Sequence, residues 1–291
     1  MISEDRFGMM PLWEHLLELL CEIDKICKRH GLRYYVTDGN ALGAVRHKGY
    51  IPWDDDLDIS MPRPDYESFC RYAKDELPKH LRVINWKTTP DFFFLFGKVQ
   101  DMRVEKVNEI EQLVDFPLSN GLFVDIFPID GFPESWWSRT MLKIQYCYLR
   151  PLHRYRMSPF KIQSFKGKII WILGMLMSPF VFFWRKPEQM MGKMESLLLK
   201  YPFESSRLTA RSCSRMTVLQ RPPVDKEIWG DGVEHEFHDR FVRVPSNVSA
   251  HLCSEYGPEY MKMPPLEKQY PSHTYSYDSA WKYGGCKDGV K

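Results

Sequence analysis

The sequence predicts an α+β fold, in which a mixed sheet is flanked by helices and carries a helical, basic and apolar insert. Three observations lead to this prediction. Segments with helical spacing alternate with short runs of β-forming residues in the first 131 residues. A row of aspartates then stands in one of the predicted strands. After Glu134 the composition changes abruptly, which marks the insert.

The elements can be assigned in order from their patterns. Apolar residues from Leu16 to Cys27 recur at helical spacing, and Gly31 is placed to end that helix. Further helices are predicted over residues 41–47, 63–74 and 189–200. Strands are predicted over residues 33–37, 55–60, 81–86, 92–99 and 121–127.

Length and composition limit the possible functions. The 291 residues are 44% apolar and 27% charged, as in ordinary globular proteins that bury a core without disulfides. The 40 basic and 38 acidic residues leave a net charge of +2, so no nucleic-acid partner is expected. The seven cysteines are scattered without a C-x-x-C pair, and no secretory signal opens the chain. Both features favour a cytoplasmic protein with reduced thiols.

Three parts are predicted: a catalytic core over residues 1–131, an insert over 132–205, and a C-terminal part over 206–291 that completes the core and the acceptor site. Residues 135–187 contain ten basic and no acidic residues. The apolar run 169–184 is too short to span a membrane and contains Pro179. We therefore expect peripheral contact with an anionic membrane through residues 150–186. The alternative is a helical hairpin that packs on the core, with its basic residues in solvent.

The acidic row carries the most specific chemistry. On a strand, Asp54, Asp56 and Asp58 would share one face, while Asp55 would point the other way. Such carboxylates repel one another unless a cation lies among them, and Mg²⁺ or Mn²⁺ accepts this kind of oxygen donor. Two alternatives are a solvated acidic turn and the D-x-D metal site of nucleotide-sugar glycosyltransferases. An EF-hand is excluded, because Ile59 would occupy the position of the required glycine.

A glycine turn lies 18 residues before Asp56 of the acidic row. Asp38, Gly39 and Asn40 separate a predicted strand from a short helix. Gly39 permits close approach of the backbone, and amides at a helix start bind anions. A strand, a glycine turn, a helix and a strand with D-x-D form the layout of a nucleotidyltransferase-type fold.

Residues 34–59, which read YYVTDGNALGAVRHKGYIPWDDDLDI, resemble the signature of the LicD family. Segments 28–34, 121–128 and 256–265 are also similar to that family. The family includes bacterial phosphocholine transferases and is related to fukutin and fukutin-related protein. The resemblance covers most of the chain outside the insert.

The resemblance implies that a phospho-alcohol is transferred from a CDP-activated donor to a sugar hydroxyl, with release of CMP. The best-known donor is CDP-choline, and the acceptors are surface glycans such as teichoic acids and lipooligosaccharides. The resemblance also implies a divalent metal held by Asp56 and Asp58. Asp125 matches the position of a third carboxylate in such folds.

The remaining site candidates follow from residue type. Asp125 could complete the metal shell or take a proton from the acceptor hydroxyl, and Asp54 could hold a second metal or orient the first. Residues that could contact the donor are grouped in two classes. Asp38, Gly39 and Asn40 form the turn, and Asp38 could reach a ribose. Arg46 and Lys98 could bind phosphate, and His47 could contact substrate or end its helix.

Two other functions remain open from the sequence. One is a nucleotidyltransferase that forms the activated donor and releases pyrophosphate. The other is a membrane-attached protein that binds glycans without catalysis. For the leading hypothesis we expect a cytoplasmic protein at the inner face of the membrane, because a lipid-linked glycan acceptor would lie there.

Overall fold

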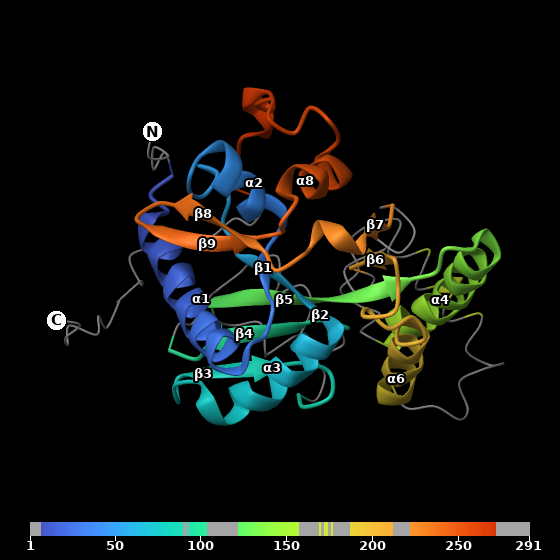
Figure 1. Ribbon diagram of the computed structural model, residues 1–291. Coiled ribbons are helices and arrows are strands. Elements are labelled where there is room, and N and C mark those ends of the chain that lie inside the picture. The colour runs from blue at the N-terminus through green and yellow to red at the C-terminus, as the bar shows by residue number, and fades with distance from the viewer. Residues whose placement is uncertain are drawn as a thin grey trace.

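The computed structural model describes residues 7–89, 92, 94–103, 122–156, 169, 172, 173, 176, 187–211 and 222–271. Within them a seven-stranded mixed sheet lies at the centre, and helices flank it (Figure 1). The predicted α+β class, with a mixed sheet, flanking helices and a helical insert, is therefore confirmed.

The described residues form six α-helices, nine strands and two short 3₁₀ helices. The α-helices are α1 (Met10–His30), α2 (Asp38–Arg46), α3 (Arg63–Glu76), α4 (Trp136–Arg156), α6 (Pro187–Leu198) and α8 (Val248–Tyr256). The strands are β1 (Tyr35–Val36), β2 (Asp58–Pro62), β3 (Leu81–Ile84), β4 (Gly97–Asp101), β5 (Leu122–Phe132), β6 (Leu208–Ala210), β7 (Val224–Asp225), β8 (Val233–Phe237) and β9 (Arg240–Val244). The 3₁₀ helices are η3 (Lys226–Ile228) and η4 (Leu266–Lys268).

Strand β5 organises the sheet. The main strand order is β1-β2-β5-β4-β3, in which β2 and β5 are parallel and the other neighbours are antiparallel. The second half of β5 pairs with β6, which pairs with β7. Strands β8 and β9 form a separate hairpin. Because β5 has 11 residues, it is long enough to pair with the central strands β2 and β4 and also with β6.

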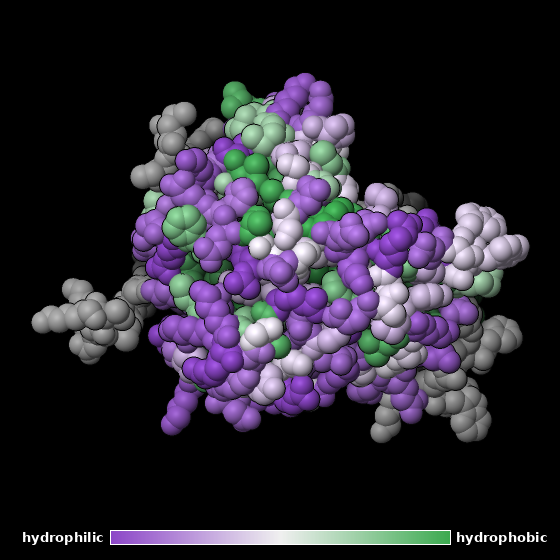
Figure 2. All heavy atoms as spheres, in the orientation of Figure 1, coloured by the Kyte–Doolittle hydropathy of each residue, from purple (hydrophilic) through white to green (hydrophobic). Residues whose placement is uncertain are grey.

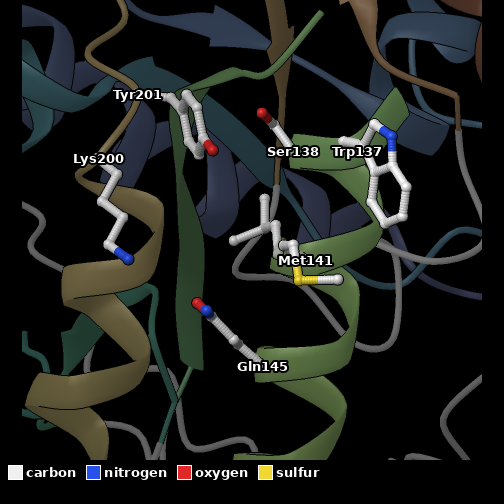
Figure 3. Close-up of a pocket in the computed structure, with 7 residues that line it drawn as sticks. Trp137, Ser138, Met141, Gln145, Lys200 and Tyr201 are labelled. Atoms are coloured by element: carbon white, nitrogen blue, oxygen red, sulfur yellow. The ribbon is translucent and has the colours of Figure 1, made fainter. Parts of the chain in front are cut away.

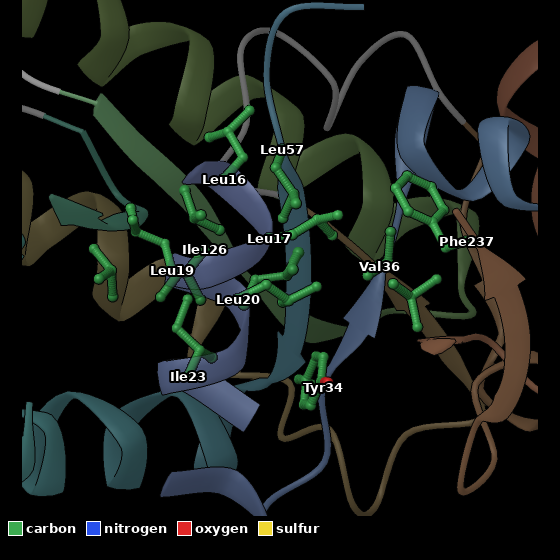
Figure 4. Close-up of a cluster of buried hydrophobic side chains, with 14 of the residues drawn as sticks. Leu16, Leu17, Leu19, Leu20, Ile23, Tyr34, Val36, Leu57, Ile126 and Phe237 are labelled. Carbon is green, nitrogen blue, oxygen red and sulfur yellow. The ribbon is translucent and has the colours of Figure 1, made fainter. Parts of the chain in front are cut away.

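Helix α1 anchors the core on one face of the sheet. Its residues Leu16, Leu19 and Ile23 are fully buried among residues of β2 and β5, as Figure 4 shows. Burial of such a side chain stabilises the fold by roughly 2 kcal/mol. The helix ends as predicted at Gly31, whose φ of 63° lies in the left-handed region that glycine tolerates.

Residues of the C-terminal part belong to the same core. Phe237, Val242, Val244 and Leu252 pack in the cluster that α1 and the central strands form, and Figure 4 shows Phe237 on the side of Val36. The C-terminal hairpin and α8 thus contribute to one core with the N-terminal elements. The division of the chain at residues 131 and 205 stays a prediction.

Helices α4 and α6 lie side by side beyond the end of β5 (Figure 1). They enclose a second apolar cluster, in which Leu142 and Tyr146 of α4 and Met194 of α6 pack with Phe132. Apart from four isolated residues, 157–186 lie outside the described residues. No described helix is both long enough and apolar enough to cross a membrane.

Two predicted boundaries near the acidic row were wrong. The strand predicted over residues 55–60 begins only at Asp58, because Asn40 binds the backbone before that point and keeps it out of the sheet. The glycine turn is not a linker, since Asp38 already begins α2. Strand β5 also continues beyond residue 127 to Phe132, where pairing with β6 extends it.

Candidate active site

Two aspartates lie opposite each other at the centre of the sheet. Asp58 on β2 and Asp125 on β5 are paired in the parallel register, and both are half-buried. On the other side of β5, Lys98 of β4 is paired with Asp125. Its Nζ lies 2.9 Å from Asp125 Oδ1. The adjacent strands thus bring together three predicted site residues that are separated by up to 67 positions in the chain.

The acidic residues before Asp58 form a loop instead of a strand. Trp13 Nε1 donates a hydrogen bond of 2.8 Å to the carbonyl oxygen of Asp54. The loop places one carboxylate oxygen of Asp54, Asp55 and Asp56 within 4.8 Å of one another. The expectation that Asp55 points away was therefore wrong, because side chains do not alternate where no strand forms.

The first turn of α2 supports this loop. Asn40 Nδ2 donates to the carbonyl oxygen of Asp56 at 2.9 Å, and its Oδ1 accepts from the Asp58 N–H at 2.7 Å. A Cβ on Gly39 would lie 2.6 Å from Asp54 Oδ2, so a larger residue there would displace the Asp54 carboxylate. Asn40, which was predicted to contact substrate, thus holds the acidic loop through hydrogen bonds. Gly39, predicted for the same role, leaves space for the Asp54 carboxylate.

Arg211 is a site residue that the sequence analysis missed. It directly follows β6 and is buried, and its guanidinium forms an ion pair with Asp38. The same guanidinium lies 3.0 Å from Glu255 of α8 and 3.4 Å from Thr37 Oγ1. Asp38 has a φ of 52°, a left-handed conformation that costs energy outside glycine. No local motif marks Arg211, because 173 residues separate it from Asp38.

The electrostatics of Asp58 reflect this crowding. Burial raises its pKa well above the ordinary aspartate value. The carboxylates of Asp56, Asp38 and Asp125 repel its charge and raise the pKa further. The Arg211 guanidinium opposes them. The negative form of Asp58 is therefore unfavourable unless an additional cation offsets the repulsion.

Asp54 is in a similar state within the loop. Burial is the largest cause that raises its pKa well above the ordinary aspartate value. Repulsion from the charges of Asp56 and Asp55 raises the pKa further. The hydroxyl of Tyr50 is fully buried and makes no hydrogen bond to a described residue. Its pKa is raised by burial first and then by the charges of Asp54 and Asp56. A polar cluster of this kind, rich in carboxylate oxygens, fits a hard divalent cation such as Mg²⁺.

The predicted metal ligands fall into two adjacent groups. Asp54 and Asp56 belong to the loop, together with Asp55, whereas Asp58 and Asp125 belong to the strands. The electrostatic coupling of Asp58 to Asp56 joins the two groups. Metal binding by these two groups, and the number of ions, stay predictions.

Arg46 and His47 lie at the other end of α2. Arg46 Nη1 donates to the carbonyl oxygens of Tyr260 and Lys262 at 3.1 and 3.3 Å. Burial lowers the pKa of His47 to about 4, and the charge of Arg46 contributes to this. Over the nine residues of α2, the two ends are about 12 Å apart. These two predicted substrate contacts thus lie at the opposite end of α2 from Asp38, Gly39 and Asn40.

The fold and the site first define a class: an enzyme with a nucleotidyltransferase-type sheet and a carboxylate centre beside a helix start. Residues 31–164 match the family model described as LicD/FKTN/FKRP, nucleotidyltransferase domain. The lipopolysaccharide cholinephosphotransferase LicD of Haemophilus influenzae is 28% identical over 266 residues, which are 88% of this chain and 92% of that protein. An uncharacterized protein of Rickettsia prowazekii is 40% identical over 50 residues, which are 17% of this chain and 19% of that protein.

Residues 31–164 thus form a domain that matches the LicD family, as the central motif indicated, and the similarity to LicD extends over most of the chain. The chain is accordingly an enzyme of the phosphotransferase class.

Proposed function

We propose that this enzyme transfers phosphocholine from CDP-choline to a sugar hydroxyl of a lipopolysaccharide-type glycan and releases CMP. The observation that carries the proposal is the pairing of Asp58 with Asp125 beside the acidic loop and the start of α2. The extended similarity to a lipopolysaccharide cholinephosphotransferase supports the choice of alcohol and acceptor.

The reaction replaces the phosphoanhydride bond of the donor with a phosphate ester bond to the sugar. The sugar oxygen attacks the phosphorus of the phosphocholine group, and the bond from that phosphorus to the oxygen of CMP breaks. The hydroxyl proton must be removed, and CMP carries the electron pair of the broken bond away. Such transfers depend on positioning and on stabilisation of negative charge.

We assign proton removal to Asp125. Its Oδ1 is buried and lies against the Lys98 ammonium, so Oδ2 is the oxygen that remains for the acceptor hydroxyl. Backbone amides at the start of α2 bind the phosphate oxygens of the donor, and Gly39 lets them approach. Mg²⁺ or Mn²⁺, held by Asp56 and Asp58 with help from Asp54, would neutralise the diphosphate and stabilise the leaving group.

We also propose that the enzyme acts at the cytoplasmic face of the membrane, where a lipid-linked glycan precursor would be available. The excess of basic residues between 135 and 187 supports peripheral attachment.

The test offers the purified protein CDP-choline, CDP-ethanolamine, CDP-ribitol and CDP-glycerol in turn. Each reaction contains Mg²⁺ and a soluble lipopolysaccharide oligosaccharide, and CMP and modified glycan are measured together. We expect CMP and phosphocholine-modified glycan in equal amounts from CDP-choline. Pyrophosphate release from CTP and phosphocholine, without glycan modification, would instead establish the nucleotidyltransferase. Asp58→Asn is the inactive control.

A further inference from the structure

Helix α4 presents an unusual number of large apolar side chains to solvent. Trp136 and Trp137 at its start are 67% and 66% exposed, and their rings contact each other at 5.1 Å between centroids. Met141 and Ile144 follow Trp137 at spacings of four and seven residues, which places all three on one side of the helix. Contiguous exposed apolar side chains commonly mark an interaction surface.

A pocket of about 200 Å³ lies next to these side chains, between α4 and the end of α6. Trp137, Met141 and Leu142 form its apolar side. Figure 3 shows the polar groups of Lys200, Tyr201 and Gln145 directed toward the space between the helices. The pocket thus combines an ammonium and neutral hydrogen-bond donors with an apolar wall, which suits an anionic headgroup attached to a hydrocarbon chain.

The charge of the sequence from residue 135 to residue 187 favours an anionic partner. The ten basic and no acidic residues of 135–187 begin with α4 and end where α6 begins. Eight of the 18 exposed large hydrophobic side chains among the described residues also lie between Trp136 and Leu176. Positive charge beside exposed tryptophan is the combination that binds the interface of an anionic bilayer.

A second exposed apolar surface lacks this combination. Tyr256, Met261, Met263 and Leu266 are exposed at and after the end of α8, at the top of the molecule, where Figure 2 shows hydrophobic and hydrophilic residues side by side. Glu259 and Glu267 lie among them, together with Lys262 and Lys268. Because both signs of charge are present, this surface offers no electrostatic preference for an anionic membrane.

We propose that the face formed by Trp136, Trp137, Met141, Ile144 and Lys200 binds anionic phospholipids. The two tryptophan rings enter the headgroup region, and the Lys200 ammonium contacts a lipid phosphate at the pocket. This inference rests on the proposed membrane attachment and is independent of the alcohol that is transferred. Compared with the sequence analysis, which expected membrane contact through residues 150–186, this inference places the contact nearer the start of α4.

The geometry separates this face from the chemistry. Asp125 and Phe132 are seven residues apart on the extended strand β5, which corresponds to about 23 Å. Helix α4 begins four residues beyond Phe132. Binding of lipid can therefore be measured without disturbing the carboxylate cluster.

The experiment is co-flotation of the full chain with vesicles of phosphatidylcholine alone or mixed with phosphatidylglycerol, at low and high salt. We expect flotation only with the anionic vesicles, and less of it at high salt. The double change Trp136→Ala and Trp137→Ala should weaken binding at least tenfold. Lys200→Gln should weaken it about fivefold, from about 1 kcal/mol for each basic residue near the surface.

The matched control is the double change Met261→Ala and Met263→Ala, which removes exposed apolar surface elsewhere and should alter binding less than twofold. Unchanged melting temperatures will show that all variants are folded.

If the wild type does not float even at low salt, both the proposed membrane attachment and the proposed face are wrong. CMP release with a soluble glycan still tests the transfer reaction in that case. If the wild type floats and the tryptophan variant floats equally, only the assignment of the face is overturned. Loss of a dimer in the tryptophan variant, without loss of flotation, would identify this face as a contact between two copies and also overturn the proposal.

Discussion

The two ends of α2 differ sharply, although one continuous motif encodes both. The N-terminal end carries Asp38, Gly39 and Asn40, which lie against the acidic loop and Arg211. The C-terminal end carries Arg46 and His47, where Arg46 binds carbonyl oxygens of residues that follow α8. A motif that resembles a single functional unit in the sequence thus divides into an end beside the carboxylate cluster and an end that contacts the residues after α8.

The physical reason for this difference is the length of the helix. About 12 Å separate the two ends, which exceeds the reach of any side chain to a shared phosphate. The comparison therefore predicts large effects on activity around the N-terminal end and small ones at the C-terminal end.

The largest effect is expected for Asp58→Asn. It removes a carboxylate at the centre of the cluster while keeping its shape, so kcat should fall by about three orders of magnitude or more. Loss of the repulsion that burial and three carboxylates impose should leave the fold intact. CMP release and circular dichroism measure both effects. Glu259→Gln, at an exposed carboxylate, is the control, and near-normal turnover of Asp58→Asn at saturating Mg²⁺ would refute the metal assignment.

Asp125→Asn should lower kcat by at least about two orders of magnitude, the usual contribution of a general base. Because the amide cannot accept the proton, raising the pH should restore part of the rate. The measurement is the dependence of kcat on pH for both proteins. A loss of less than tenfold would mean that Asp125 only supports Lys98.

Arg211→Lys should act through Asp38. Lysine keeps the charge, yet it cannot bridge Asp38, Glu255 and Thr37 in the way a planar guanidinium does. We expect the KM for the CDP donor to rise about tenfold and kcat to change less than threefold. Arg207→Lys, at an exposed arginine of the same segment, is the control. An equal fall in kcat with unchanged KM would contradict the positioning role.

A moderate effect on stability is expected from divalent cations and pH. Asp54 and Asp58 have pKa values raised by burial and repulsion, so their contribution to stability is present at low pH and is lost as the pH rises through the raised values. In EDTA the melting temperature should therefore fall between mildly acidic and neutral pH more steeply for the wild type than for Asp58→Asn. Mg²⁺ at 100 times its Kd should add about 2.7 kcal/mol, or several degrees. An equal Mg²⁺ response in Asp58→Asn would place the ion elsewhere.

The smallest effect is expected for His47→Gln at the C-terminal end of α2. Since burial lowers its pKa to about 4, His47 is neutral at pH 7 and is a poor proton acceptor for the reaction. We expect kcat/KM to stay within about threefold and the pH profile between 6 and 8 to keep its shape. A tenfold loss of kcat/KM, measured with both substrates varied, would contradict the difference in function that we infer between the two ends of α2.

Much of this protein was determined by local sequence. The apolar spacing of α1 and the glycine at its end predicted a helix that the structure contains, because periodicity and a left-handed end are local properties. The predicted helix over residues 63–74 corresponds to α3, and the run of aspartates predicted the place of the acidic cluster. The central motif also predicted the domain over residues 31–164 that matches the LicD family model.

Other features were decided only by the tertiary structure. Asp55 joins its neighbours because Asn40 and Trp13 hold the segment as a loop, which no alternation rule can anticipate. Arg211 reaches Asp38 because β6 pairs with the far half of β5 and brings the two together. The energy of a buried guanidinium depends on its charged partners, and those partners come from distant segments. Residue type and spacing determine which elements form, whereas long-range pairing determines which charges meet.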